Sequence, residues 1–298
     1  MIGWKRERGS ANHSQLTDTA FHLMDTPTIS EQHLLHREHG GQNVHDAKFD
    51  QIRPAEARYT VKSIIGEEKL EFLDTIQYED QSVHIENARK TLDASGNEGM
   101  LSSKEDILNP DRRMIMLYCE DYNCVGMIGP EAHHEKNNPD VSSDNFHNTF
   151  LGLVRSEGLS EKENEAGGNF GIGKVRLWRH SGIGTVFVYS RLSTPYRGHK
   201  TRLIGINRLA AEPQEVGDQE IINHSKIAYF GKESSTPSGR QFSASIYDEE
   251  ADEMAAKLGF SIREKEEYGT SVLILDYHPR DDRKLEDASL EWIRDDLI

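Results

Sequence analysis

The chain has 298 residues, of which 35% are hydrophobic and 29% charged, so it can bury a core as one large domain or two small ones. Its 51 acidic residues outnumber its 35 basic residues, and the net charge of −16 argues against a surface made mainly for DNA or anionic membranes. The two cysteines, and the lack of a signal-peptide core or a membrane-length apolar run, favour a soluble cytoplasmic protein.

In the first half of the chain the patterns predict mainly helices. Residues 1–25 are polar and are expected to form an N-terminal arm outside the folded domain. Thr28 and Glu31 make a capping-box pattern, which predicts a helix from there to about residue 48. Periodicity then predicts a strand, two helices and a buried strand that ends in acidic residues, over residues 58–65, 67–76, 83–92 and 112–121.

The second half is predicted to be richer in strands. Residues 130–169 are polar and glycine-rich around the short apolar patch "FLGLV", and a short helix is expected over 175–180. Residues 231–245 are interpreted as a loop because of their composition. Strands are predicted over residues 184–192, 201–209, 225–231 and 269–277, and helices over residues 247–260 and 285–297.

This order of elements predicts an α+β fold. We expect a two-layer sandwich, in which helices pack on one face of a mixed, largely antiparallel sheet. Residues 26–280 are assigned to one domain and residues 281–298 to a C-terminal helix.

The glycine-rich stretch "GGNFGIGKV", residues 167–175, nearly matches the P-loop pattern G-x-x-x-x-G-K-[ST]. A P-loop also needs a buried strand before it and a hydroxyl after its lysine to bind Mg²⁺. Here the acidic stretch "LSEKENEA" precedes the glycines, and Val175 follows Lys174. We therefore prefer a flexible loop whose backbone amides close over an anion, with Lys174 adding a positive charge. A P-loop NTPase and an ordinary surface loop remain alternatives.

Four short motifs follow one another along the chain, "QNVHDA" (42–47), "EDYNCVGM" (120–127), "GGNFGIGK" (167–174) and "YGTSVLILD" (268–276). In this order they resemble the N-box, adenine box, ATP lid and last box of the GHKL ATPase superfamily, which includes gyrase-type topoisomerases, heat-shock chaperone ATPases, histidine kinases and MutL. The chain is most similar to divergent bacterial ATP-binding proteins whose lid reads roughly GSFGxGK, several of them from anti-phage defence or DNA-modification loci. The resemblance implies a Bergerat-type ATP-binding fold with a lid over about residues 127–174.

The resemblance also implies a role for each motif. Asn43 of the N-box would hold Mg²⁺ through its amide oxygen, and Asp46 would contribute to the same nucleotide site. Asp121 would accept a hydrogen bond from the amino group of adenine, and Gly126 would let the base approach the backbone. Thr270 would offer its hydroxyl to the same network of carboxylate, base and water. The remaining nucleotide contacts implied by the motifs are Met127, Gly168, Phe170, Gly171, Gly173 and Lys174.

The chain departs from the family pattern at the residue that polarises the attacking water. Most members have a glutamate four residues before the N-box asparagine, where this chain has His39, and Glu38 lies five residues before Asn43. The two glycines that follow His39 could admit a π-bulge that brings Glu38 onto the Asn43 face of the helix, and we prefer Glu38 as the catalytic base. His39 acting as a neutral imidazole is the alternative, and slow hydrolysis is a third. Asn123 also stands where glycine is common.

The leading functional hypothesis is a Mg²⁺-dependent ATPase that acts as a nucleotide-driven conformational switch. Its ligands would be ATP and ADP, and its partner a second copy in a nucleotide-dependent homodimer or a separate effector protein. A catalytically weak pseudo-ATPase is the alternative that the His39 departure favours, and histidine-kinase-like phosphotransfer is disfavoured because no phosphoacceptor helix pair is apparent. His33, His36 and His39 raise a zinc site, but residues three apart drift around a helix, so a solvated face is preferred. No membrane contact is expected, and the charge does not support direct nucleic-acid binding.

Overall fold

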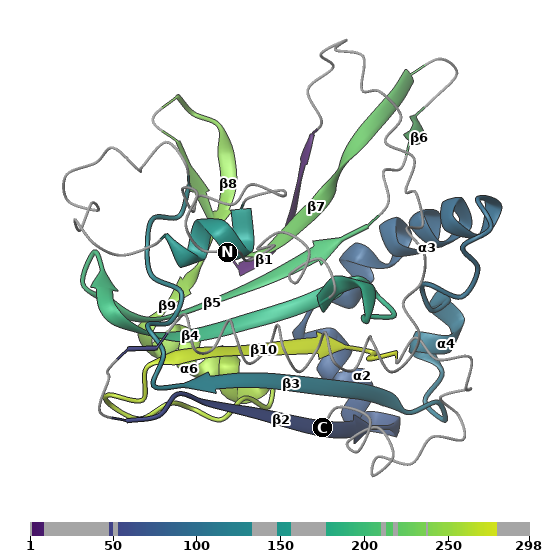
Figure 1. Ribbon diagram of the computed structural model, residues 1–298. Coiled ribbons are helices and arrows are strands. Elements are labelled where there is room, and N and C mark those ends of the chain that lie inside the picture. The colour runs from purple at the N-terminus through teal and green to yellow at the C-terminus, as the bar shows by residue number, and fades with distance from the viewer. Residues whose placement is uncertain are drawn as a thin grey trace.

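One large sheet runs through the part of the chain that the structure describes. Figure 1 shows the computed structural model, which describes residues 2–8, 48–49, 53–132, 148–155, 177–209, 213–216, 220–236 and 238–278. The strands are β1 (Ile2–Arg8), β2 (Glu56–Ile64), β3 (Met114–Tyr122), β4 (Thr185–Tyr196), β5 (His199–Arg208), β6 (Pro213–Val216), β7 (Glu220–Ser235), β8 (Gln241–Ala244), β9 (Ile246–Tyr247) and β10 (Gly269–Leu275).

Strand order in this 10-stranded sheet is β1-β7-β5-β4-β10-β3-β2, with β6 and β8 paired to β7 and β9 paired to β5. Every pairing recorded among the described strands is antiparallel. The α+β class and the largely antiparallel sheet are therefore confirmed, whereas the parallel component of a mixed sheet is not found among the described strands.

Three helices cover one face of the sheet, behind the strands in Figure 1. They are α2 (Gly66–Thr75), α3 (Tyr78–Ala94) and α6 (Asp248–Lys257), and the short α4 (Lys104–Leu108) lies between α3 and β3. Side chains alternate between the faces of a strand, and β3 gives this face Met114, Met116 and Tyr118. In the same buried cluster the helices contribute Leu73, Ile85, Ala251 and Ala255.

The opposite face of the sheet is also buried. It receives the intervening β3 residues Ile115 and Leu117, which cluster with Phe150, Val154 and Trp178. These come from the π-helix η2 (Leu151–Arg155), the residue before it, and a single helical turn at residues 177–179. Helices α2, α3 and α6 do share one face, as predicted, but the second face carries its own packed layer, and we call it the η2 face.

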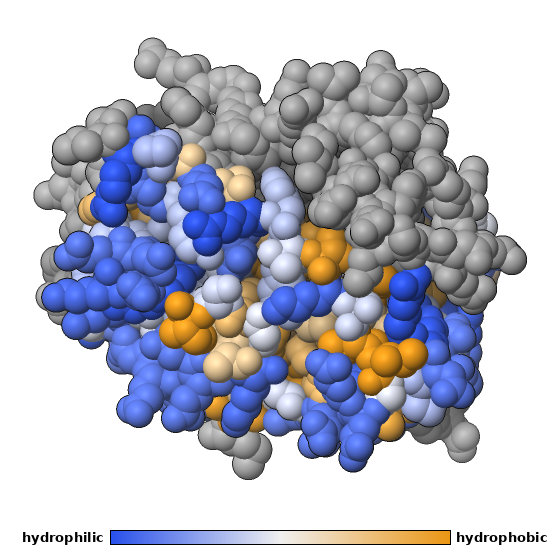
Figure 2. Space-filling model, turned by 90° about the horizontal axis from the view of Figure 1, so that it is seen from below, coloured by the Kyte–Doolittle hydropathy of each residue, from blue (hydrophilic) through white to orange (hydrophobic). Residues whose placement is uncertain are grey.

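Figure 2 shows the molecule from below the β2 edge, where hydrophilic residues cover much of the coloured surface. Apolar side chains on this side form small separate groups, which is normal for a protein surface. The large hydrophobic residues that are exposed in the described part of the chain are Phe49, Tyr59, Ile65, Leu70, Val83 and Ile262.

Most of the predicted elements are present in the structure. The confirmed strands are those predicted over residues 58–65, 112–121, 184–192, 201–209, 225–231 and 269–277, and the confirmed helices those over residues 67–76, 83–92 and 247–260. Except for Lys48 at its end, the helix expected over residues 28–48 lies outside the described residues, as do the helix expected over residues 281–298 and the central part of the proposed lid.

Two predictions are wrong. Residues 2–8 do not belong to an arm: they form β1, which pairs with β7, and Trp4 packs edge-on against Phe187 and Phe230 at centroid distances of 5.9 and 5.5 Å. Residues 231–245 are not a loop, because β7 continues to Ser235 and β8 returns beside it. A Cβ at Gly231 would lie 2.1 Å from the carbonyl oxygen of Ala244, so this glycine permits a close strand pairing rather than marking a turn.

Candidate functional site

Three polar residues lie side by side across neighbouring strands near the tip of β3. Thr270 of β10 lies opposite Ser190 of β4. On the other side of β10, Ser271 lies opposite Glu120 of β3, so in this antiparallel pair Thr270 lies opposite Asp121. Alternation from Ile115 and Leu117 places all three side chains on the η2 face. The backbone N–H of Thr270 donates to Oδ1 of Asp121 at 2.8 Å, and the Thr270 and Ser190 hydroxyl oxygens are 3.4 Å apart. We call these three residues the polar row.

The loop after β3 folds back over the Ser190 end of the polar row. The Met127 N–H donates to Oγ of Ser190 at 2.9 Å, and Ser190 donates to the carbonyl of Gly269 at 2.8 Å. Gly126 has φ +76, and a Cβ there would lie 2.5 Å from the Arg191 carbonyl oxygen and 2.8 Å from Ser190 Oγ. Only glycine allows this approach without displacing β4.

The turn after β3 accommodates Asn123 through its backbone conformation. Asn123 has φ +56, a left-handed conformation that asparagine tolerates better than most residues. Its side-chain amide donates to the carbonyl of Arg53 at 2.6 Å. Lys48 forms an isolated antiparallel bridge with Cys124, and the Phe49 N–H donates to the Asn123 carbonyl at 2.8 Å. The chain that directly follows the "QNVHDA" motif is therefore fixed to the turn that follows Asp121.

Behind Asp121, on the helix-covered face, lies a buried charged network. Arg263 is 3% exposed and donates to Oγ of Ser271 at 2.9 Å, and Ser271 donates to Oε1 of Glu120 at 2.9 Å. Gly269 has φ +146, and a Cβ there would lie 2.6 Å from Asp121 Oδ1 and 2.7 Å from Arg263 Nη1. The missing side chain of Gly269 thus leaves the space in which the carboxylate and the guanidinium approach each other.

These surroundings act on Asp121 in opposite directions. On balance the pKa of Asp121 is raised, mainly by desolvation, whereas the charge of Arg263 and the hydrogen bonds from the Thr270 amide and the Cys124 thiol lower it. The neighbouring Glu120 raises the pKa further. Burial also raises the pKa of the Cys124 thiol to about 12, so this cysteine is a neutral neighbour and not a nucleophile.

Chemically, the polar row suits recognition of a flat ligand with an amino group. A carboxylate accepts hydrogen bonds, and the next row along the same face, formed by Val188, Val272 and Cys119, is apolar. The Ser190 hydroxyl already donates to a carbonyl, and no base among the described residues hydrogen-bonds to it, so the described part of the chain does not activate it as a nucleophile.

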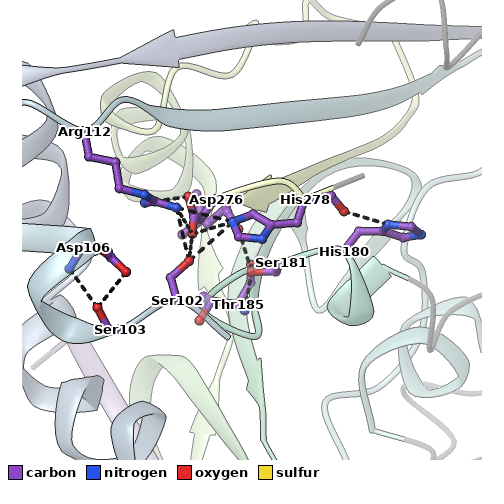
Figure 3. Close-up of polar contacts among 10 residues, drawn as sticks. Ser102, Ser103, Asp106, Arg112, His180, Ser181, Thr185, Asp276 and His278 are labelled. Carbon is purple, nitrogen blue, oxygen red and sulfur yellow. Dashed lines mark hydrogen bonds and ion pairs between the residues drawn. The ribbon is translucent and has the colours of Figure 1, made fainter. Parts of the chain in front are cut away.

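A second buried polar cluster lies at the other end of β10 and is drawn in Figure 3. Oδ2 of Asp276 accepts from Ser102 Oγ at 2.6 Å and from Arg112 Nη2 at 3.2 Å. A Ser–His–Asp relay needs the serine and the carboxylate on different imidazole nitrogens. Here both face Nε2 of His278, at 3.4 and 3.1 Å. The cluster therefore joins the loop before α4, the start of β3 and the end of β10, and it does not activate Ser102.

Of the residues singled out from the sequence, the structure brings Asp121, Gly126, Met127 and Thr270 together. Sequence reasoning noticed Gly269 only as part of a motif and missed Ser190 and Arg263. The other predicted site residues lie outside the described residues, and these are Glu38, His39, Asn43, Asp46, Gly168, Phe170, Gly171, Gly173 and Lys174. Within the described ranges, no group of three or more His, Cys, Asp or Glu side chains is placed to hold a metal ion.

Comparison of this chain with protein-family models, curated proteins and solved structures returned no match. No helix among the described residues is long and apolar enough to cross a membrane. The assignment of a function therefore depends on the geometry of the site.

Proposed function

We propose that this chain binds ATP in a GHKL-type site of Bergerat architecture, with the base on the polar row. One observation carries the proposal: the Thr270 amide donates to the Asp121 carboxylate, which joins two motifs that lie 149 residues apart in the sequence. Asp121 would then accept a hydrogen bond from the exocyclic amine of adenine, and the loop at Gly126 would contact the edge of the base.

The bridge between Lys48 and Cys124 supports the proposal from the other side of the site. Asn43 precedes Lys48 by five residues, and an extended chain covers at most about 18 Å over that separation. A base and a triphosphate span a comparable length, so an amide at Asn43 is within reach of the phosphates of a nucleotide held at Asp121.

In this proposal the remaining chemistry is positioning and electrostatics. Asn43 would hold Mg²⁺, while Lys174 and the amides of the glycine-rich lid would hold the phosphates. Glu38, or His39 in its place, would orient the attacking water. Closing of the lid on nucleotide would change the surface offered to a second copy or to an effector protein.

The first test is calorimetric titration with a non-hydrolysable ATP analogue, with and without Mg²⁺. Asp121→Asn should weaken binding by about 10- to 100-fold, because a hydrogen bond to a charged group contributes about 1.5–3 kcal/mol. Asp74→Asn, an exposed carboxylate of α2, is the matched control and should bind like wild type. Equal affinity of wild type and Asp121→Asn, or no binding by wild type, would refute the proposal.

Turnover then separates an ATPase from a binding module. Glu38→Ala should abolish hydrolysis and retain nucleotide binding if Glu38 is the base, and His39→Ala should do so if the histidine is. Wild-type turnover at the background rate, together with tight binding, would favour the pseudo-ATPase that the His39 departure suggests.

A further inference from the structure

Arg263 is a buried cation whose surroundings direct it toward Asp121. It lies in the segment between α6 and β10, and its guanidinium packs over the ring of Tyr122 at 4.5 Å from the centroid. Its Nη2 donates to Ser271, while its Nε has no hydrogen-bond partner among the described residues. No ion pair between Arg263 and a carboxylate is recorded within the part of the chain that the structure describes, so its charge acts at slightly longer range.

The nearest carboxylate that faces the ligand side is Asp121. Atoms of Arg263 and Asp121 lie 2.7 and 2.6 Å from the same point, the position that a Cβ of Gly269 would take. The two charges are therefore within the roughly 4–6 Å over which an opposite charge favours an ionised carboxyl. Among the described residues, the other titratable groups that act on Asp121 are Glu120, which opposes its ionisation, and the Cys124 thiol, whose hydrogen bond favours it.

The protonation state of Asp121 decides what it can bind. Oδ1 already accepts the Thr270 amide, and Oδ2 offers further lone pairs that can accept the amino group of a base. A proton on Oδ2 would turn this acceptor into a donor that faces another donor. Desolvation favours that proton, and Arg263 is the cation that opposes it.

We infer that Arg263 is a positioning residue, which keeps the Asp121 carboxylate charged and fixed in place for the amino group of the base. The inference rests on the proposed nucleotide site and assigns a residue that touches neither the base nor the phosphates. It gives a role to a buried cation that forms no ion pair with a carboxylate of the described residues.

The test is the pH profile of adenosine binding between about pH 5.5 and 8.5, by equilibrium dialysis. Adenosine has no phosphate, so no phosphate titrates in this range. In Arg263→Met the pH below which binding is lost should rise by about 1–3 units, with affinity recovering at high pH, because the opposing charge is gone. Arg263→Lys keeps the charge and should retain the wild-type profile. Arg58→Met removes another guanidinium that packs on Tyr122, at 4.2 Å, and serves as the matched control.

A direct readout needs no ligand. The carboxyl carbon of Asp121, assigned in NMR spectra by comparison with Asp121→Asn, should titrate at higher pH in Arg263→Met than in wild type. If the methionine variant does not fold, Arg263→Gln is used, which keeps a donor near Ser271 and removes the charge.

Superimposable pH profiles and carboxyl titrations for wild type and a folded, uncharged Arg263 variant would overturn the inference. Equal losses in Arg263→Lys and Arg263→Met at every pH would also overturn it, because they would reflect shape and not charge. If wild type binds neither adenosine nor the ATP analogue, the proposed function falls, and the carboxyl titration still decides whether Arg263 holds Asp121 ionised.

Discussion

At the scale of single residues, the geometry of the site depends on Gly269. Its φ of +146 is a conformation that only glycine adopts readily, and a Cβ there would lie 2.3 Å from the Asp121 carbonyl oxygen. Gly269→Ala should therefore lower the free energy of unfolding and weaken adenosine binding together, because the alanine must push Asp121 aside.

Gly96→Ala is the matched control for Gly269→Ala. Gly96 also has a positive φ, +80, but its Cβ would meet nothing within 4 Å. Both variants carry the backbone cost of a side chain at positive φ, and Gly269→Ala should cost about 1–3 kcal/mol more because of the clash. Urea denaturation measures the difference, and equal losses in the two variants would contradict the crowding argument.

The sequence predicted the site residues that belong to short motifs and missed those that do not. Asp121 and Thr270 each end or begin a buried strand, where a polar residue stands out against an apolar run. Ser190 interrupts the strand "TVFVYSRL" in the same way, but nothing local pairs it with Thr270. Arg263 lies in a segment without periodicity. Its neighbours Ser271 and Glu120 come together next to Asp121 only because β10 and β3 pair in this register.

At the scale of elements, the contacts of Trp4 attach the edge strand β1 to the rest of the fold. Trp4 donates from its indole N–H to the Ile76 carbonyl at 2.7 Å and packs on Phe187 and Phe230. Trp4→Ala should therefore lower the free energy of unfolding by about 3–5 kcal/mol, measured by urea denaturation. Lys5→Ala, which removes an exposed ion pair on the same strand, should cost no more than about 1 kcal/mol. A loss for Trp4→Ala as small as that for Lys5→Ala would show that β1 contributes little to the fold.

Helices and strands with a regular pattern of apolar residues were predicted well, whereas strands that depend on pairing with a neighbouring strand were not. The alternating apolar pattern of β2 and the helical pattern of α3 are local properties that a sequence displays. By contrast, β1, β8 and β9 become strands because a neighbouring strand supplies their hydrogen bonds, and β8 lies in a stretch rich in serine and glycine. Composition alone cannot distinguish such a hairpin from a loop.

At the scale of the whole molecule, the order of the strands creates the site. Strand β10 inserts between β3 and β4, although β5 to β9 intervene along the chain. Consecutive strands pair more often than not, so this insertion cannot be derived from the pattern of elements. It is the reason that Asp121, Thr270 and Ser190 become neighbours, while alternation along the three strands turns their side chains away from α2, α3 and α6.

A buried ion-pair network joins the loop at the start of the proposed lid to the sheet. Glu131 is 4% exposed and lies between Arg202 of β5 and Arg155 of η2, while Tyr247 of β9 donates to it. Burial alone would raise the pKa of Glu131, but the two arginines and the hydrogen bonds lower it to about 2. Through one carboxylate, the network holds the loop at Glu131 and the π-helix η2 against strands β5 and β9.

This network predicts how the stability of the molecule depends on pH. The folded-state pKa of Glu131 is below its ordinary value of 4.5, so the folded protein binds fewer protons here than the unfolded chain. The stability from this group is fully present above about pH 4.5 and is lost as the pH falls toward 2.

Glu131→Gln should cost about 3–5 kcal/mol at pH 7, because Arg202 is left buried without its partner. In urea denaturation the gap between wild type and Glu131→Gln should shrink as the pH falls below 4.5, whereas Glu249→Gln, at an exposed position of α6, should follow wild type throughout. A gap that stays constant down to pH 3 would mean that the charge of Glu131 does not hold these segments together.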